Sequence, residues 1–205
     1  AGHEVVVYCR PPEGEKASDQ PDEYLGMELV HLPAVRHRVL ETLSHTAVSM
    51  LHPSISDVDC AIVFNAGNAP LIPVLRAHGI PVATHVDGLE WRRSKWSKVG
   101  RRYYRAVEAL AVRWSDALIA DAVGIADYYR TEFGAPTELI AYGAPIITDA
   151  GTDRIAALGL EPKGYHLVVA RFEPENHVLE AVRGYVASNA ELPLVVVGSS
   201  PYGME

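Results

Sequence analysis

One short segment gathers most of the chemically capable side chains of the chain: His85-Val86-Asp87-Gly88-Leu89-Glu90-Trp91-Arg92-Arg93-Ser94-Lys95-Trp96. It holds one histidine, two carboxylates, three cations and two tryptophans. The apolar residues before it predict a buried strand, so the segment lies at the carboxyl end of a sheet, where ligands bind. Any single charge is explained equally well by a solvated helix start, with the tryptophans packed on the domain. The whole cluster favours a functional site.

A second segment, Arg171-Phe172-Glu173-Pro174-Glu175-Asn176, also follows an apolar run and opens a predicted helix. Free backbone amides at a helix start attract phosphate, and an arginine binds phosphate oxygens through two parallel hydrogen bonds. The alternative is a surface arginine paired with Glu173 or Glu175. These carboxylates would repel a diphosphate unless they turn away or hold sugar and ribose hydroxyls.

A third segment, Asn65-Ala66-Gly67-Asn68-Ala69-Pro70, is a predicted turn that either caps the next helix or lines the same cleft. Other motifs are absent from the sequence. There is no phosphate-binding loop, no Gly-x-Gly-x-x-Gly and no metal-ligand spacing among the nine histidines, so no metal site is expected. Without a Gly-x-Ser-x-Gly elbow, Ser44-His45 and Ser56-Asp57 do not indicate a hydrolase.

The composition is that of an ordinary globular protein, with 48% hydrophobic and 21% charged residues among 205. No apolar run approaches the ~20 residues of a membrane-spanning helix, and no signal-peptide pattern opens the chain. The net charge of −8 argues against general nucleic-acid binding. Cys9 and Cys60 lie at apolar runs, which favours buried free thiols in a reducing cytoplasm and leaves a disulfide open.

Apolar runs alternate with helical patterns along the chain, which predicts a doubly wound, Rossmann-like α/β fold with parallel strands buried on both faces. The predicted strands are Glu4–Tyr8, Met27–His31, Cys60–Phe64, Pro81–Val86, Ala117–Ala120, Glu138–Ala141, His166–Ala170 and Leu194–Val197. The predicted helices are Arg36–Leu51, Pro70–His78, Lys95–Trp114, Ile125–Phe133, Ile155–Leu158 and His177–Ser188.

A domain boundary is predicted at Tyr142-Gly143-Ala144-Pro145, where glycine and proline follow a strand before the same alternation restarts. Residues 1–143 are predicted to form one Rossmann-like domain and residues 144–205 the beginning of a second, with a ligand cleft between them. Both ends of the sequence cut into predicted elements, so the chain is expected to be a fragment.

These segments together resemble glycosyltransferase family 4, and more closely its bacterial rhamnosyltransferase-like branch. The most specific part is Asp87-Gly88-Leu89-Glu90-Trp91-Arg92-Arg93-Ser94-Lys95-Trp96. The supporting matches, in order, are Glu41-Thr42-Leu43-Ser44-His45-Thr46, Asn65-Ala66-Gly67-Asn68-Ala69-Pro70, Ala120-Asp121 with Gly124-Ile125, Ile140-Ala141-Tyr142-Gly143, and Ala170-Arg171 with Pro174-Glu175-Asn176.

The resemblance implies a GT-B enzyme that transfers a sugar, with rhamnose as one candidate, from a nucleotide-sugar donor with retention of anomeric configuration. The acceptor would be a glycan or a lipid-pyrophosphate sugar, and neither a cofactor nor a tightly bound metal is expected. It implies catalytic roles for His85, Asp87 and Glu90. Donor-binding roles fall on Arg171, Glu175, Asn176 and Gly198, and acceptor-binding roles on Asn65, Asn68, Trp91, Arg92, Arg93 and Lys95. Asn176 stands where many relatives carry lysine, which leaves one phosphate contact in question.

The resemblance places the glycine-rich loop before Ala1 and the paired donor-site glutamates beyond Glu205, so the isolated chain is expected to be inactive. Two other functions stay open: a GT-B sugar-nucleotide 2-epimerase and a non-catalytic nucleotide- or sugar-binding relative. A periplasmic binding protein also has two α/β lobes, but the absent signal and the Arg171 segment count against it. The expected location is the cytoplasm, with Arg101-Arg102-Tyr103-Tyr104-Arg105 as either a peripheral contact to the inner membrane face or a solvated helix face.

Overall fold

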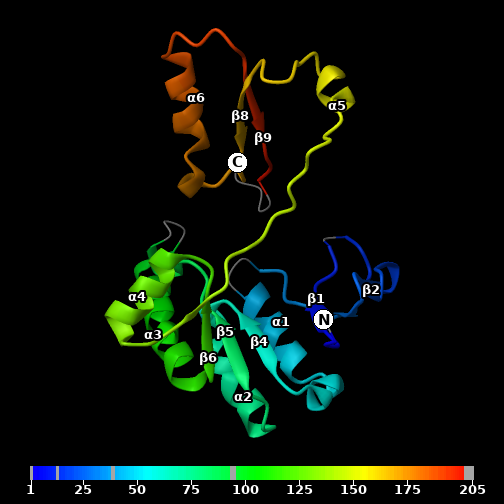
Figure 1. The fold of residues 1–205 in the computed structure, drawn as a ribbon. Helices are drawn as coiled ribbons and strands as arrows, with labels where there is room; N and C mark the ends of the chain where they lie inside the picture. The colour runs from blue at the N-terminus through cyan, green and yellow to red at the C-terminus, as the bar shows by residue number, and fades with distance from the viewer. Residues whose placement is uncertain (1, 13, 38–39, 93–95, 201–205) are drawn as a thin grey trace. The chain divides into compact units, whose positions relative to one another are not determined.

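The computed structural model describes residues 2–12, 14–37, 40–92 and 96–200. These residues belong to two compact units, the first within Ala1–Arg92 and Trp96–Tyr142 and the second within Gly143–Glu205. Figure 1 shows the course of the chain through both units. Each unit is described by itself.

The first unit is built on a four-stranded parallel sheet in the order β4-β5-β6-β7. Its strands are β4 (Ala61–Phe64), β5 (Val82–His85), β6 (Ala117–Ala120) and β7 (Glu138–Leu139). Val63 pairs with Thr84 and His85 pairs with Ile119, so the carboxyl ends of neighbouring strands lie at one edge. The predicted Rossmann-like α/β fold is confirmed.

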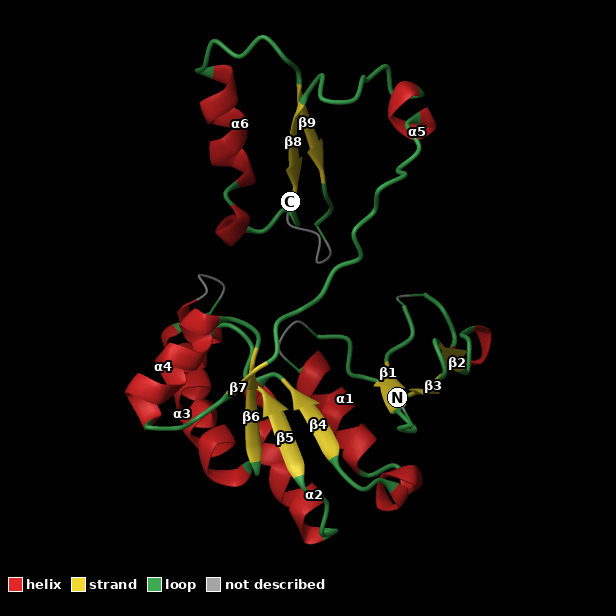
Figure 2. Cartoon of the chain, viewed as in Figure 1, coloured by secondary structure: helices red, strands yellow, loops and turns green. Residues whose placement is uncertain are grey.

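Four helices accompany this sheet, as Figure 2 shows: α1 (Glu41–Met50), α2 (Ile72–Ala77), α3 (Lys98–Trp114) and α4 (Val123–Phe133). Short 3₁₀ helices, which the sequence did not predict, are η1 (Ala17–Asp19), η2 (Pro53–Asp57), η3 (Ala66–Leu71) and η4 (Glu90–Arg92). The sequence placed the start of α3 at Lys95, but the hydroxyl of Ser97 accepts a hydrogen bond from the amide of Gly100 and so caps the helix there. Gly134, at φ 62°, ends α4 in the left-handed conformation.

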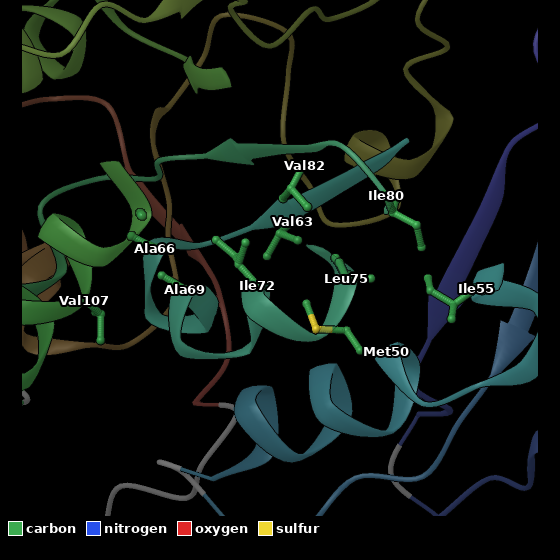
Figure 3. Close-up of a cluster of buried hydrophobic side chains, with 11 residues drawn as sticks. Met50, Ile55, Val63, Ala66, Ala69, Ile72, Leu75, Ile80, Val82 and Val107 are labelled. Carbon is green, nitrogen blue, oxygen red and sulfur yellow. The ribbon is translucent and has the colours of Figure 1, made fainter. Parts of the chain in front are cut away.

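The core of the first unit lies between the sheet and the helices α1, α2 and α3 (Figure 3). Ile72 and Leu75 of α2 are completely buried against Val63 and Val82 of the sheet. Burial of each such side chain contributes roughly 1.5–3 kcal/mol to folding. A second cluster, made of Val86, Leu118, Ala120, Tyr129 and Ala135, packs the other part of the sheet against α4.

One carboxylate joins three elements at the amino end of this sheet. Asp116 Oδ2 accepts a hydrogen bond of 2.8 Å from the amide of Val82, at the start of β5. Its Oδ1 lies 3.0 Å from the Arg76 guanidinium on α2. The Val82 amide, with a smaller contribution from Arg76, lowers the pKa of Asp116.

The first three strands form a sheet of their own in the order β1-β3-β2, with β1 (Val6–Cys9) parallel to β3 (Met27–His31) and β2 (Glu23–Tyr24) antiparallel to it. The prediction of one continuous parallel sheet was wrong here, because no described strand joins β1 to β4. The hairpin between β2 and β3 turns at Leu25 and Gly26, both at positive φ (52° and 78°), as a tight hairpin turn requires.

Both cysteines are free, as the sequence favoured, but their burial differs from the prediction. Cys9 is half-buried in β1, and burial raises the pKa of its thiol. Cys60 is exposed because it precedes the first residue of β4 and therefore stays outside the sheet.

The second unit contains a two-stranded parallel sheet of β8 (His166–Val169) and β9 (Leu194–Val197), with α5 (Asp153–Ala156), η5 (Pro174–Asn176) and α6 (Val178–Val186). The prediction that both strands are buried was wrong. Leu167 and Val169 are 54% and 70% exposed, because no further strand pairs with this sheet within the described residues. Among those residues, no helix in either unit combines the length and the apolar composition needed to cross a membrane.

Candidate functional site at the strand tips

His85 is the last residue of β5 and is only 5% exposed. Its ring lies between two aromatic rings, with centroid distances of 5.2 Å to Phe64 and 5.5 Å to Tyr142. Phe64 ends β4, and Tyr142 follows β7, so three separate strand ends fix the imidazole. The sequence predicted the histidine at this edge but neither of the rings beside it.

The turn after β4 is held in place against the same edge. The amide of Asn65 donates a hydrogen bond of 3.1 Å to the carbonyl of His85. Asn65 has a φ of 74°, and its side-chain oxygen accepts a bond of 2.7 Å from the amide of Gly67. This geometry brings the predicted residues Asn65 and His85 together.

Asn68, the second predicted asparagine, is 3% exposed within η3. Its amide nitrogen donates a hydrogen bond of 2.8 Å to the carbonyl of Phe64. Its side-chain oxygen is buried and has no hydrogen-bond partner among the described residues. Asn68 therefore fixes the end of β4 while keeping one acceptor unused inside the protein, which is costly unless a ligand or water satisfies it.

The predicted carboxylates occupy different surroundings. Asp87 is exposed two residues after His85, and one of its oxygens accepts a hydrogen bond of 2.9 Å from the amide of Gly88. Glu90 is half-buried, and its carboxylate accepts a hydrogen bond of 3.2 Å from the Trp96 indole. Asp87 is therefore the more solvent-accessible of these two carboxylates.

Two guanidinium groups lie near the ring of Trp91. The guanidinium groups of Arg92 and Arg105 lie 5.1 Å and 4.8 Å from its ring centroid, within the range of cation–π attraction. The predicted acceptor residues Trp91 and Arg92 thus contact each other, while Arg93 and Lys95 lie outside the described residues. Arg105 links this segment to α3, a connection that the sequence analysis missed.

Behind Trp91 lies a buried polar network that the sequence analysis also missed. Glu108 of α3 is 3% exposed and accepts a hydrogen bond of 2.8 Å from the hydroxyl of Tyr128 on α4. Arg105 donates to the same hydroxyl at 3.1 Å and lies 3.5 Å from Glu132. Burial raises the pKa of Glu108, while Tyr128 and Arg105 lower it. Burial together with Glu108 raises the pKa of Tyr128 to about 12.

The raised pKa of Glu108 predicts that the difference in stability between the protein and its Glu108→Gln variant depends on pH. Because the pKa of Glu108 is raised on folding, the folded state binds its proton more tightly than the unfolded state. This contribution to stability is therefore lost as pH rises from the ordinary glutamate pKa through the raised value. The variant should gain stability relative to the parent over that interval, as measured by urea unfolding at a series of pH values. A difference between the two proteins that does not change with pH would contradict this prediction.

The second unit brings three predicted residues to one sheet edge. Arg171 follows β8 and is exposed, and Gly198 follows the neighbouring strand β9. The Asn176 side chain donates a hydrogen bond of 2.7 Å to the carbonyl of Arg171. Asn176 therefore folds the loop back on the backbone of Arg171.

Gly198 permits a close approach between the two strand ends. A Cβ atom built at this position would lie 2.0 Å from the carbonyl oxygen of Ala170. The amide of Phe172 donates to the carbonyl of Ser199 at 2.9 Å, so the backbone pairing extends past β8 and β9. Arg171 is held directly within this narrow junction.

The two glutamates of this loop differ in exposure. Glu173 is 7% exposed and therefore lies largely inside the unit, whereas Glu175 is half-buried. Within the described residues, no group of three or more histidine, cysteine, aspartate or glutamate side chains is arranged to hold a metal ion.

Comparison with known proteins gives one family match. Residues 77–145 match the model of a domain of unknown function, DUF1972. The matched region contains β5 to β7, His85 and the Trp91–Arg105–Glu108 network. No curated protein matches the chain.

Proposed function

We propose that the chain is part of a nucleotide-sugar-dependent glycosyltransferase of the GT-B type, related to the rhamnosyltransferase-like branch of family 4. The observation that carries the proposal is the buried His85 at the tip of β5, inside the region that matches DUF1972. That domain is commonly associated with glycosyltransferase-related proteins. In Rossmann-like folds, ligands bind at the carboxyl ends of the parallel strands, and His85 lies at such an end.

In this proposal the first unit binds the acceptor. Asp87, exposed beside His85, orients the acceptor hydroxyl and His85 contacts the reacting sugar, while Asn65 and Asn68 hold the strand-tip loop in place. The buried side-chain oxygen of Asn68 supports a ligand at this edge because an unpaired buried acceptor costs about 1–3 kcal/mol. Trp91 and Arg92 extend the same surface.

The second unit binds the donor in this proposal. Arg171 neutralises the negative charge that develops on the departing nucleotide diphosphate. Hydrogen-bond donors that are already positioned at such developing charge lower the activation barrier most. Asn176 positions Arg171 through its carbonyl, and Gly198 keeps the neighbouring strand end close. The sugar leaves its diphosphate with retention of configuration, and no metal takes part.

Arg171 gives a direct test of the donor site. The variant Arg171→Ala should bind nucleoside diphosphates about 10- to 100-fold more weakly in isothermal titration calorimetry, because it loses a charge-assisted hydrogen-bond pair. Arg183→Ala is the matched control, since Arg183 is an exposed arginine on α6 of the same unit. Equal affinities of the parent and the Arg171→Ala variant would contradict the assignment.

The reaction itself is tested with the protein as its gene encodes it. Uridine, guanosine and deoxythymidine diphosphate sugars are paired with a lipid-pyrophosphate sugar acceptor, and the products are identified by NMR. Transfer from one donor with a retained anomer is the expected result. An epimerised nucleotide sugar formed from donor alone would replace the proposal with a 2-epimerase, and donor binding without any turnover would replace it with a binding protein.

A further inference from the structure

The exposed side of α3 carries several positively charged side chains. Lys98, Arg101, Arg102 and Arg105 are spaced i, i+3, i+4 and i+7, so they lie on one side of the helix, and all four are exposed. Residues 92–105 hold seven lysines and arginines and no aspartate or glutamate, in a chain whose net charge is −8. Seven of the 18 lysines and arginines of an otherwise acidic chain therefore lie in one short stretch of the sequence.

Three of these cations are available to a partner. Arg105 is engaged by Trp91, Tyr128 and Glu132. Within the described part of the chain, Lys98, Arg101 and Arg102 form no ion pair. We name these three residues the basic face.

An apolar surface adjoins the basic face. Val99 is 76% exposed and lies beside Arg102, on the flank of the basic face, in the order of residues around the helix. One turn further, Tyr103 lies on the same side as Val99 and lines an apolar cavity of about 440 Å³ together with Val35, Leu40, Leu43, Ala47, Pro70 and Leu71. Val35 and Leu40 are themselves about half exposed. Cations and exposed apolar groups thus lie side by side at the start of α3.

We propose that the basic face, with Val99 and the adjoining apolar cavity, docks the protein on a membrane rich in anionic lipid. Anionic headgroups match the three cations, and acyl chains match the exposed apolar surface. A nucleic acid fits less well, because the rest of the chain is acidic and an apolar cavity has no role against a phosphate backbone. This docking does not depend on the reaction proposed for the strand-tip site.

The number of cations in the basic face sets the expected loss of vesicle affinity when they are replaced. A lysine or arginine near an anionic membrane surface strengthens binding by about fivefold. The triple variant Lys98→Gln/Arg101→Gln/Arg102→Gln should therefore bind anionic vesicles about 100-fold more weakly than the parent. The variant Val99→Ser should lose a smaller part of the vesicle affinity. The part lost is the hydrophobic contribution, which salt does not screen.

Vesicle flotation with the full chain tests the proposal. One set of vesicles is pure phosphatidylcholine, and the other contains about one-third phosphatidylglycerol, each at about 0.1 M and 0.5 M salt. The parent should float with the anionic vesicles at low salt and largely detach at high salt. The matched control Lys16→Gln/Arg154→Gln/Arg183→Gln removes three exposed cations elsewhere and should bind like the parent. The charge-preserving variant Arg101→Lys/Arg102→Lys should also bind like the parent.

Three results would overturn the proposal. The first is equal flotation of the parent and the triple variant when both show the same circular dichroism and thermal unfolding. The second is equal binding to neutral and anionic vesicles. The third is tight binding of single-stranded RNA by the parent without flotation, which would assign the basic face to nucleic acid instead.

Discussion

Replacement of Gly198 by alanine is expected to destabilise the second unit by about 3 kcal/mol. The added Cβ would lie 2.0 Å from the carbonyl oxygen of Ala170, and a backbone atom cannot rotate away as a side-chain end can. The strand ends must separate, which breaks the backbone hydrogen bonds from Ala170 to Val197 and from Phe172 to Ser199. We expect amide hydrogen exchange in β8 and β9 to become about 100-fold faster, as measured by mass spectrometry.

Gly184→Ala is the matched control for this prediction. Gly184 lies within α6 of the same unit, and a Cβ built there meets no atom within 4 Å. Alanine at this position should stabilise the helix by about 0.5–1 kcal/mol. If Gly198→Ala and Gly184→Ala have the same effect on exchange, the close approach of the two strand ends is not important for stability.

The second large effect is expected at His85. Under the proposed function, His85→Gln should lower kcat/KM for sugar transfer by about 10²- to 10⁴-fold, the usual contribution of a positioned acid–base group. Glutamine keeps much of the volume between Phe64 and Tyr142, so the free energy of unfolding should change little. Transfer assays and urea unfolding on the same preparation separate these two quantities.

His78→Gln serves as the control, because His78 is an exposed histidine at the end of α2 and far from the strand tips in the fold. It should leave both measurements unchanged. Full activity of His85→Gln would remove His85 from the reaction and leave it as a packing residue between two rings.

The regular elements of the chain were largely predictable from the sequence. The bounds of β3, β6 and β9 were predicted residue for residue. For β6 and β9 the signal was a short apolar run bounded by polar, proline or glycine residues, which is typical of strands. The hairpin at Leu25 was not predictable in the same way. Leucine carries no turn preference, and its φ of 52° is imposed by the pairing of β2 with β3.

The candidate site was predictable only in part. His85 was found because strand tips of parallel sheets carry ligand contacts, a rule that needs only the order of elements. The rings of Phe64 and Tyr142 come from other strand ends, so their contact with His85 depends on tertiary structure. The burial of Glu108 also depends on tertiary structure. In the sequence, a glutamate in a helix suggests a surface position. In the fold, the hydroxyl of Tyr128 on another helix donates a hydrogen bond to its carboxylate, which lowers the cost of burying it.

The carboxylate of Asp116 has a consequence for how this fold can diversify. It ties α2, β5 and the start of β6 together at the amino end of the sheet, opposite the edge that carries His85 and Asn65. Mutations in the loops at the carboxyl edge therefore leave this anchor intact. Such a division lets the loops at one end of the domain change in sequence while the other end keeps the polypeptide folded.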